Sequence, residues 1–341
     1  MTQVPAFAVI SGAQVHEAVS GHEEQVTRMV EAAYRLHGEG RTVNPDSYFL
    51  RFPDRPSDRI IALPASVKGD VGVHGIKWIS SFPGNVARGV PRASAVLILN
   101  DAETGYPFAC LESSIISAAR TAASAALAAA VLADARGSRP RRVGFVGVGL
   151  IARYIHTYLA GNGFTFDELG VHDLSREHAE GFTEYLARSE KGDITIHDSA
   201  ESLIRSSDLI VFATVAGEPH VHDPAWFEHN PLVLHVSLRD LSPEIILASY
   251  NVVDDVEHCM KANTSPHLAE QKVGDRDFVA GTLYDVLTGK TAPPAGKPVV
   301  FSPFGLGVLD LAVAKYVYDQ VSAAGTLHTV PDFFHELKRY G

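Results

Sequence analysis

Cysteine is scarce in this chain. Only Cys110 and Cys259 occur among its 341 residues, and neither has the spacing of a metal site. A disulfide framework is therefore excluded, and a reducing compartment is indicated. The short apolar run within the first 20 residues is not preceded by Lys or Arg, so we expect no secretory signal. Together these absences predict a cytoplasmic protein.

Positive charge is also in short supply. The chain has 29 Lys and Arg against 40 Asp and Glu, for a formal net charge of −11. Such a field repels polyphosphate backbones and anionic lipids, so we expect neither nucleic acid nor membrane as a partner. The longest apolar stretch, 115–133, is mostly alanine and is interrupted by Arg120, which is more typical of a soluble helix than of a membrane span.

Internal repeats and low-complexity segments are absent, which excludes a solenoid. The length predicts two domains. In the first part, short β-branched runs at 58–66, 72–80 and 93–100 predict strands, and 112–135 has helical spacing followed by Gly137. The first part is therefore expected to be an α+β domain.

From Arg142 onward, predicted strands alternate with predicted helices. This alternation is typical of a doubly wound parallel sheet, the Rossmann fold. We expect this Rossmann domain at 121–319, and a discontinuous α+β domain at 1–120 plus 320–341. After 251–255 the sequence predicts a loop-rich stretch and then a helix at 309–322. The predicted strands are VGFVG, LGVHD, ITIH, LIVFAT and VLHVS, and the predicted helices are 150–159 and 176–188.

A glycine-rich turn follows the first of these strands. Gly147 and Gly149 would let the backbone approach a pyrophosphate, with Leu150 and Ile151 opening the next helix. The motif alone is a weak signal. Its context strengthens it, because the acidic Asp173 ends the following strand, as in dinucleotide-binding domains.

Asp173 indicates the type of dinucleotide. A carboxylate there accepts hydrogen bonds from both ribose hydroxyls and repels a 2′-phosphate, which predicts NAD rather than NADP. Arg176 would soften that preference, and a surface turn aspartate is the alternative interpretation. Thr214 ends a predicted strand where its side chain should face the cofactor.

Two cations have unusual surroundings for charged residues. Lys77 interrupts a predicted strand between apolar neighbours, and Arg120 lies on a helix of small residues. Burying either without an anion would be costly, so both are candidates for binding a substrate carboxylate. A snorkelling strand lysine and an interdomain salt bridge are the structural alternatives.

At these residues the chain resembles the ornithine cyclodeaminase and μ-crystallin family. The resemblance covers nearly the whole chain, and its motifs together are far more specific than the glycine turn. They are GIKWISSFPGN at 75–85, NDAETGYPFA at 100–109, SAARTAAS at 117–124, GVGLIA at 147–152, LRDLSPE at 238–244 and SPFGLGVLD at 302–310.

The resemblance implies roles for particular residues. Lys77 would bind the substrate carboxylate and polarise water, Arg120 would bind substrate and cofactor, and Asp240 would be the catalytic acid that relays a proton. A family arginine position is occupied here by Ser47, and Arg51 is the expected substitute in substrate binding. Thr121 and Ser237 are further expected cofactor contacts. For Asp240, a helix N-terminal residue is the alternative.

Within the family, the chain most resembles the branch that makes L-2,3-diaminopropionate for siderophores or antibiotics. The resemblance implies NAD-dependent oxidative cleavage of N-(2-amino-2-carboxyethyl)-L-glutamate, a small acidic amino acid, by a homodimer. Three alternatives remain: an ornithine or lysine cyclodeaminase, a ketimine reductase, and a non-catalytic protein of the μ-crystallin type. The branch motifs include YFLR at 48–51, DRIIALP at 58–64 and VVDD at 252–255.

Two histidines lie close together in a loop that contains proline. His220 and His222 have no third ligand nearby in the sequence, so we expect solvated side chains and no metal site.

Overall fold

A computed structural model describes residues 6–335, and the chain divides into two compact units. Unit 1 runs to Arg120 and resumes at Leu306, and unit 2 is Thr121–Gly305. The expected ranges, 1–120 plus 320–341 and 121–319, place the second boundary inside helix α11 (Gly307–Ala323). The helix belongs wholly to unit 1, because its buried side packs on strands and helices of that unit. Residues 1–5 and 336–341 of the expected first domain lie outside the described residues.

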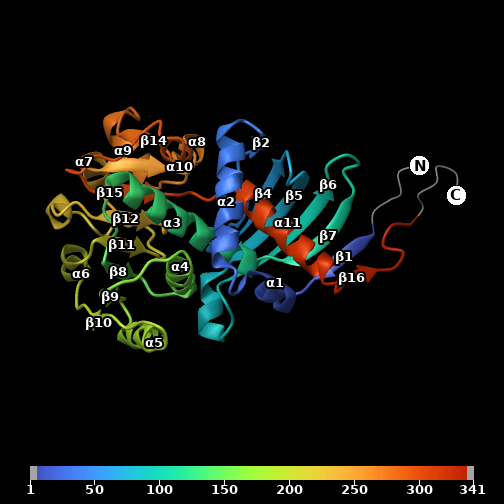
Figure 1. The fold of residues 1–341 in the computed structure, drawn as a ribbon, viewed down its shortest axis with the longest axis horizontal. Coiled ribbons are helices and arrows are strands. Elements are labelled where there is room, and N and C mark those ends of the chain that lie inside the picture. Colours follow the sequence, from blue (N-terminus) through green and yellow to red (C-terminus); the bar gives the residue numbers. More distant parts are fainter. Residues whose placement is uncertain (1–5, 336–341) are drawn as a thin grey trace. The chain divides into compact units, whose positions relative to one another are not determined.

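Unit 1 is built on an eight-stranded mixed sheet in the order β16-β1-β7-β6-β5-β4-β2, with β3 also paired to β4 (Figure 1). β1 and β7 are parallel, and the other pairs are antiparallel. The strands expected at 58–66, 72–80 and 93–100 are confirmed as β4, β5 and β6. The strands are β1 (Phe7–Ile10), β2 (Thr42–Val43), β3 (Tyr48–Phe52), β4 (Arg55–Val67), β5 (Val73–Ser81), β6 (Ala93–Asp101), β7 (Pro107–Glu112) and β16 (His328–Val330).

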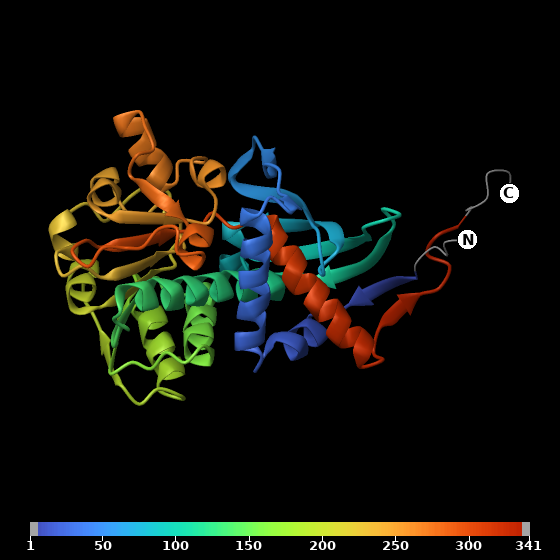
Figure 2. The same cartoon turned by 45° about the horizontal axis from the view of Figure 1, so that its top comes forward.

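Helices cover one face of this sheet. Helix α11 packs on β4, β5 and β6 and on α2 (Glu23–Gly38), while α1 (Gly12–Val19) contacts β7 (Figure 2). Burial alternates along β6, where Ala95, Leu97 and Leu99 are buried under the helices. This alternation follows from the two-residue period of a strand with one covered face. A short 3₁₀ helix, η1 (Pro83–Arg88), follows β5.

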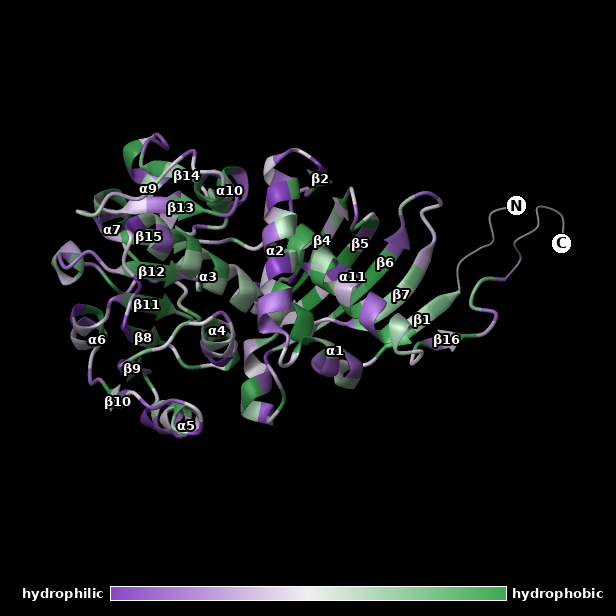
Figure 3. Cartoon of the chain, in the orientation of Figure 1, coloured by the Kyte–Doolittle hydropathy of each residue, from purple (hydrophilic) through white to green (hydrophobic). Residues whose placement is uncertain are grey.

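Unit 2 is built on an eight-stranded sheet in the order β10-β9-β8-β11-β12-β15-β13-β14, and every pairing in it is parallel. The expected Rossmann architecture is confirmed. Its central strands are hydrophobic along their length (Figure 3), as a sheet buried on both faces requires. The strands are β8 (Arg142–Val146), β9 (Glu168–His172), β10 (Asp193–Ile196), β11 (Leu209–Phe212), β12 (Leu232–His235), β13 (Tyr250–Val253), β14 (Val279–Thr282) and β15 (Val299–Ser302).

The stretch after residue 255, expected to be loop-rich, contains several short elements instead. Two of these helices have only four and five residues, which is too short to show a full hydrophobic period in the sequence. The helices of unit 2 are α4 (Leu150–Gly161), α5 (Arg176–Leu186), α6 (Ala200–Ser206), η2 (Pro224–Phe227), α7 (Pro243–Ala248), α8 (Val256–Cys259), α9 (Ser265–Val273) and α10 (Leu283–Leu287).

Helix α3 (Ser114–Arg136) contains the division between the units, after Arg120. Among the described residues, α3 is the one helix long and apolar enough to cross a membrane by length and composition. Of its most apolar window, 67% is buried within the structure, as in the core helix of a soluble protein.

Candidate functional site

The glycine turn lies between β8 and α4. Gly147 has φ +79°, and a Cβ there would lie 2.9 Å from Thr214 Cγ2 and 3.0 Å from the Ala213 carbonyl oxygen, so the position requires glycine. A Cβ on Gly149 would meet no atom within 4 Å. The turn thus leaves an open cradle before the N-terminus of α4, which fits the pyrophosphate of a dinucleotide.

Asp173 follows β9 and faces this turn. One carboxylate oxygen accepts a hydrogen bond from the Val148 N–H (3.1 Å), and the other accepts from the Ser175 N–H (2.9 Å). The nearby Arg176 forms an ion pair with Glu180 at 2.9 Å. The acid is therefore fixed against the glycine turn, and the arginine that could have weakened its preference for NAD is engaged elsewhere.

The other expected cofactor residues have varied surroundings. Leu150 is exposed and Ile151 is half-buried in the first turn of α4. Thr121 is half-buried on α3. Thr214 and Ser237 lie in the loops after β11 and β12, and both hydroxyls donate to the carboxylate of Asp240.

Asp240 is the centre of a buried polar cluster in unit 2. Its side chain is fully buried, and Oδ1 is 3.0 Å from Nε2 of His220. With the hydroxyls of Thr214 and Ser237, three side chains donate to it. Burial alone would raise the Asp240 pKa, but the hydrogen bonds, that from His220 foremost, hold the pKa well below its usual range. Asp240 is therefore a permanent anion.

A second imidazole contacts Asp240 in another way. The buried His235 has Nε2 3.1 Å from the Asp240 N–H, which donates to it. The same nitrogen lies 3.3 Å from Asp240 Oδ2, and Nδ1 lies 3.2 Å from the hydroxyl of Ser302. His235 thus contacts both the backbone and the carboxylate of Asp240.

The backbone fixes this cluster. The N–H groups of His220 and Val221 both donate to the Asp240 carbonyl, each at 3.0 Å, and the Ser242 N–H donates to Val221 at 2.9 Å. Leu238 is held at φ +75°, an unfavourable conformation for a branched residue. The two loops are thus locked together, and the His220–Asp240 geometry follows from backbone pairing.

His220 is therefore not the solvated histidine expected from the sequence. Its side chain is 40% exposed, but Nε2 is bound to Asp240. The two residues are 20 positions apart, on loops after different strands. Their meeting depends on β11 and β12 being neighbours in the sheet, so spacing along the chain could not show it.

Unit 1 contains a second buried carboxylate, which the sequence analysis did not single out. Asp310 on α11 is fully buried between two cations: Oδ2 lies 2.7 Å from Nζ of Lys77, and Oδ1 lies 3.1 Å from Nε of Arg120. Lys77 also donates to the hydroxyl of Ser117 at 3.3 Å. Lys77 and Arg120, both expected to bind a substrate carboxylate, thus lie close together because both bind the carboxylate of Asp310.

The Lys77 amine is poised close to neutrality. Burial lowers its pKa from 10.5 to about 8, with Asp310 raising the pKa and Arg120 lowering it further. An amine in this range exchanges protons far more readily near pH 8 than an ordinary lysine does.

Further cations share the sheet face of Lys77. Arg51 pairs across the strands with Arg59, and Arg59 pairs with Ser81, four residues beyond Lys77 on β5. Because side chains alternate between faces, all four point to the same side. Arg92 adds a guanidinium that donates to the Ser81 hydroxyl at 2.7 Å.

Arg51 itself is exposed, and its guanidinium carbon lies 4.9 Å from the centre of the Phe49 ring. Within residues 6–335, no hydrogen bond or ion pair joins Arg51 to Lys77 or Arg120. It shares their sheet face but not their buried cluster.

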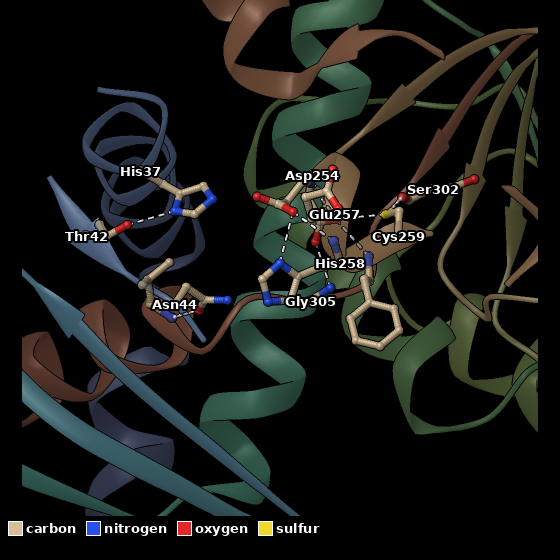
Figure 4. A network of polar contacts seen from close by, with 12 residues as sticks. His37, Thr42, Asn44, Asp254, Glu257, His258, Cys259, Ser302 and Gly305 are labelled. Atoms are coloured by element: carbon tan, nitrogen blue, oxygen red, sulfur yellow. Dashed lines mark hydrogen bonds and ion pairs between the residues drawn. The ribbon is translucent and has the colours of Figure 1, made fainter. Parts of the chain in front are cut away.

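A third buried carboxylate connects two strand ends in unit 2 (Figure 4). Asp254, after β13, accepts from the N–H groups of Phe304 (2.9 Å) and Gly305 (2.7 Å), and from the Cys259 thiol at 3.2 Å. Burial, with Asp254 next, raises the Cys259 pKa well above its usual value, so this thiol stays protonated. In the part of the chain described, no group of three or more His, Cys, Asp or Glu side chains could hold a metal ion.

The fold and the glycine turn define a dinucleotide-binding protein of the Rossmann type, and its relatives support an oxidoreductase. The model of the ornithine cyclodeaminase/mu-crystallin family matches residues 8–325. The chain belongs to this family, as its motifs indicated.

Individual relatives show how the family varies. The chain is 26% identical over 324 residues to N-((2S)-2-amino-2-carboxyethyl)-L-glutamate dehydrogenase of Staphylococcus aureus, covering 91% of this chain and 94% of the relative. The solved structure of CmnK is 30% identical with a TM-score of 0.86, and covers 96% of this chain and 99% of its own. An archaeal alanine dehydrogenase dimer with bound NAD is 26% identical with a TM-score of 0.85, at 96% and 99% coverage. The NAD expected from the sequence matches the cofactor in that structure.

Proposed function

We propose that the protein is an NAD-dependent dehydrogenase that cleaves N-(2-amino-2-carboxyethyl)-L-glutamate into L-2,3-diaminopropionate and 2-oxoglutarate. One observation carries this proposal: the sheet face of unit 1 around Lys77 is rich in cations. The described charges there include Arg51, Arg59 and Lys77, with Arg120 joined to Lys77 through Asp310.

The balance of charge in this region favours an anionic substrate. The single carboxylate of Asp310 is shared between Lys77 and Arg120, so these two cations exceed their anion by one charge, and the exposed Arg51 lies on the same sheet face. A substrate with several carboxylates would balance that excess, each charge-assisted contact contributing about 2 kcal/mol. A cationic amino acid such as ornithine brings an extra positive charge and gains less there.

The cradle at Gly147 and Gly149 and the carboxylate of Asp173 fit NAD, which would accept the hydride from the glutamate Cα of the secondary amine. Asp173 would bind the ribose hydroxyls and repel a 2′-phosphate. Leu150 and Ile151 would place their backbone N–H groups near the pyrophosphate at the start of α4.

The remaining steps fall to the residues of the chain. Arg51, Lys77 and Arg120 hold the carboxylates, and Lys77 polarises the attacking water. Water adds to the iminium carbon left by hydride loss, and the C–N bond then breaks. The balance is substrate, NAD⁺ and water in, and 2-oxoglutarate, diaminopropionate, NADH and one proton out. Asp240 supplies a fixed negative charge in the nucleotide-binding unit.

The direct test is incubation of the protein with NAD⁺ and N-(2-amino-2-carboxyethyl)-L-glutamate. We expect stoichiometric NADH at 340 nm and both products by mass. L-Ornithine converted to proline without net NADH would identify a cyclodeaminase instead, and consumption of added NADH with a cyclic ketimine would identify a reductase. NADH binding without turnover of any of these compounds would favour a non-catalytic binding protein.

We further propose a homodimer formed through the uncovered face of the unit 1 sheet. Trp78 (41% exposed) and Val96 (43% exposed) are register partners on that face, and Val9, Tyr48 and Leu50 are exposed there too. A contiguous apolar face of this kind favours burial against a second copy. Trp78→Glu should convert a dimer to a monomer in light scattering. The two free thiols agree with a cytoplasmic enzyme.

A further inference from the structure

We propose that His220 is the residue that carries the proton in this reaction, and that Asp240 is a positioning residue that holds His220 and balances its charge. The inference rests on the proposed function, in which a proton leaves water and another reaches the substrate nitrogen. It assigns that transfer to a histidine on the loop after β11.

Asp240 is poorly suited to carry the proton itself. Its side chain has no exposed surface, and three side chains already donate to its two oxygens. These hydrogen bonds hold the Asp240 pKa well below its usual range, so the ionised form is favoured. A carboxyl group with this lowered pKa and occupied oxygens is a poor proton carrier, but it can stabilise an adjacent imidazolium.

His220 has the complementary properties. Nε2 faces Asp240 Oδ1 at 3.0 Å, so this nitrogen carries the proton that the carboxylate binds. Within the described residues the other nitrogen, Nδ1, has no hydrogen-bond partner, and 40% of the side chain is exposed. One nitrogen is thus anchored, and the other is available to accept a proton.

The second imidazole of the cluster is excluded by its geometry. His235 is fully buried, and its Nε2 already accepts the Asp240 N–H. Nε2 also lies 3.3 Å from Oδ2 of Asp240, but protonating it would break the bond from the Asp240 N–H, and the buried ring has no contact with solvent to exchange a proton. Of the two imidazoles that contact Asp240, only His220 can gain and lose a proton without disturbing the loop.

His220 and Asp240 lie at the edge of the sheet that carries the dinucleotide motif. Thr214 bonds to Asp240 through its hydroxyl, and its methyl group lies beside the space above Gly147. β8, β11 and β12 are parallel neighbours, so the loops that follow them meet at one edge. A chain of contacts therefore runs from the glycine turn through Thr214 and Asp240 to His220.

The protons of this reaction balance if His220 is the one residue that carries a proton. When water adds to the iminium carbon, a C–O bond forms and His220 Nδ1 takes the proton that the water oxygen loses. The imidazolium then gives this proton to the substrate nitrogen. The C–N bond breaks with its electron pair on nitrogen, the carbonyl forms, and the hydroxyl proton leaves to solvent. His220 ends neutral, as it began.

The test compares His220→Gln with the matched control His222→Gln, an exposed histidine two residues further on. Gln can still donate to Asp240 but cannot carry a proton. We expect kcat to fall about 10²-fold in His220→Gln, with KM and the NADH Kd within about threefold of the parent, and no change in the control. Retention of kcat within threefold, or a parallel loss of NADH binding, would overturn the inference.

Chemical rescue separates proton transfer from a structural role. In His220→Ala, added imidazoles should restore turnover, and the rescued rate should rise with the base strength of the imidazole. A structural role predicts no rescue, or rescue that is independent of base strength.

Failure of the proposed function is recognisable separately. If the parent protein turns over none of the compounds above, the proposed reaction is wrong, and carbethoxylation by diethyl pyrocarbonate decides the question of His220. Protection of His220 but not His222 by NADH with 2-oxoglutarate would support a place at the reacting atoms. Equal modification with and without these ligands would overturn it.

Discussion

The two buried aspartates at the centre of the proposed chemistry have opposite environments. Asp310 in unit 1 lies between the formal cations Lys77 and Arg120. Asp240 in unit 2 is surrounded by hydroxyls, imidazoles and backbone. The first anion is balanced by charge, and the second is stabilised by hydrogen bonds from groups that are mostly neutral.

This difference separates two tasks. An ion-paired aspartate neutralises cations that would otherwise be too costly to bury, so removing it should destabilise the fold. An aspartate held by neutral donors keeps most of its negative charge available to the surroundings, so removing it should mainly affect chemistry. Four experiments test this difference.

The largest effect is expected for Asp310→Asn. The change leaves Lys77 and Arg120 as buried cations without a counter-ion, and we expect the free energy of unfolding to fall by about 3 kcal/mol or more. Urea denaturation measures this loss. Asp319→Asn, on the exposed side of the same helix, removes a surface ion pair with Lys315 and should cost less than about 1 kcal/mol. Equal losses in both variants would contradict the charge-balancing role.

Asp240→Asn should act on turnover. We expect kcat to fall about 10²–10³-fold, because His220 loses the anion that orients it and stabilises its charged form. The NADH Kd, from fluorescence titration, should change by less than about threefold, which corresponds to under 1 kcal/mol. The control is Glu218→Gln, which removes an exposed charge from the loop of His220. Unchanged turnover in Asp240→Asn would refute the assignment.

The buried lysine should leave a signature at alkaline pH. Lys77 loses its proton near pH 8 in the folded protein and near 10.5 when unfolded. Between these values the unfolded chain binds more protons, so stability rises with pH relative to Lys77→Met, by at most about 1 kcal/mol per pH unit. Urea titrations at several pH values measure the difference. In the exposed control Lys68→Met, the free energy of unfolding should change with pH as it does in the parent. The lowered pKa of Lys77 would be contradicted if the free energy of unfolding of Lys77→Met also changed with pH as in the parent.

The smallest effect concerns Asp173, a partly exposed carboxylate that accepts hydrogen bonds from the Val148 and Ser175 N–H groups and lies 3.8 Å from Nδ1 of His178. Asp173→Ser should shift the ratio of kcat/KM for NAD over NADP by about tenfold, or about 1.4 kcal/mol, toward NADP. Glu177→Gln, in the first turn of α5, is the control for loss of nearby charge. No shift in Asp173→Ser would mean that the ribose hydroxyls bind elsewhere.

Much of unit 2 was predictable from the sequence. β8, the turn at Gly147, α4 and the acid Asp173 follow one another within 32 residues, and their signals are local: strand composition, glycine conformation and helix period. α8 and α10 were missed because their four and five residues are too few to show a period, and α9 was missed because its buried positions are Ser265, Pro266 and Ala269, which form no apolar stripe.

The candidate site was predictable only in part. Lys77 stood out because it interrupts an apolar strand, and Arg120 because small residues surround it. Asp310 gave no such signal, since an aspartate in the first turn of a helix is common for reasons of capping and dipole. His220 was interpreted as solvated because its partner lies on another loop.

The family, the Rossmann order of strands and helices, and the glycine turn could be predicted from the sequence, because their signals lie in residues close together along the chain. Which charges meet depends on the tertiary structure. Lys77 and Asp310 are 233 residues apart, and α11 must lie across β5 for them to touch. His220 and Asp240 meet because β11 and β12 are adjacent and their loops share backbone hydrogen bonds. Such pairings depend on sheet order and helix placement, which spacing along a chain does not encode.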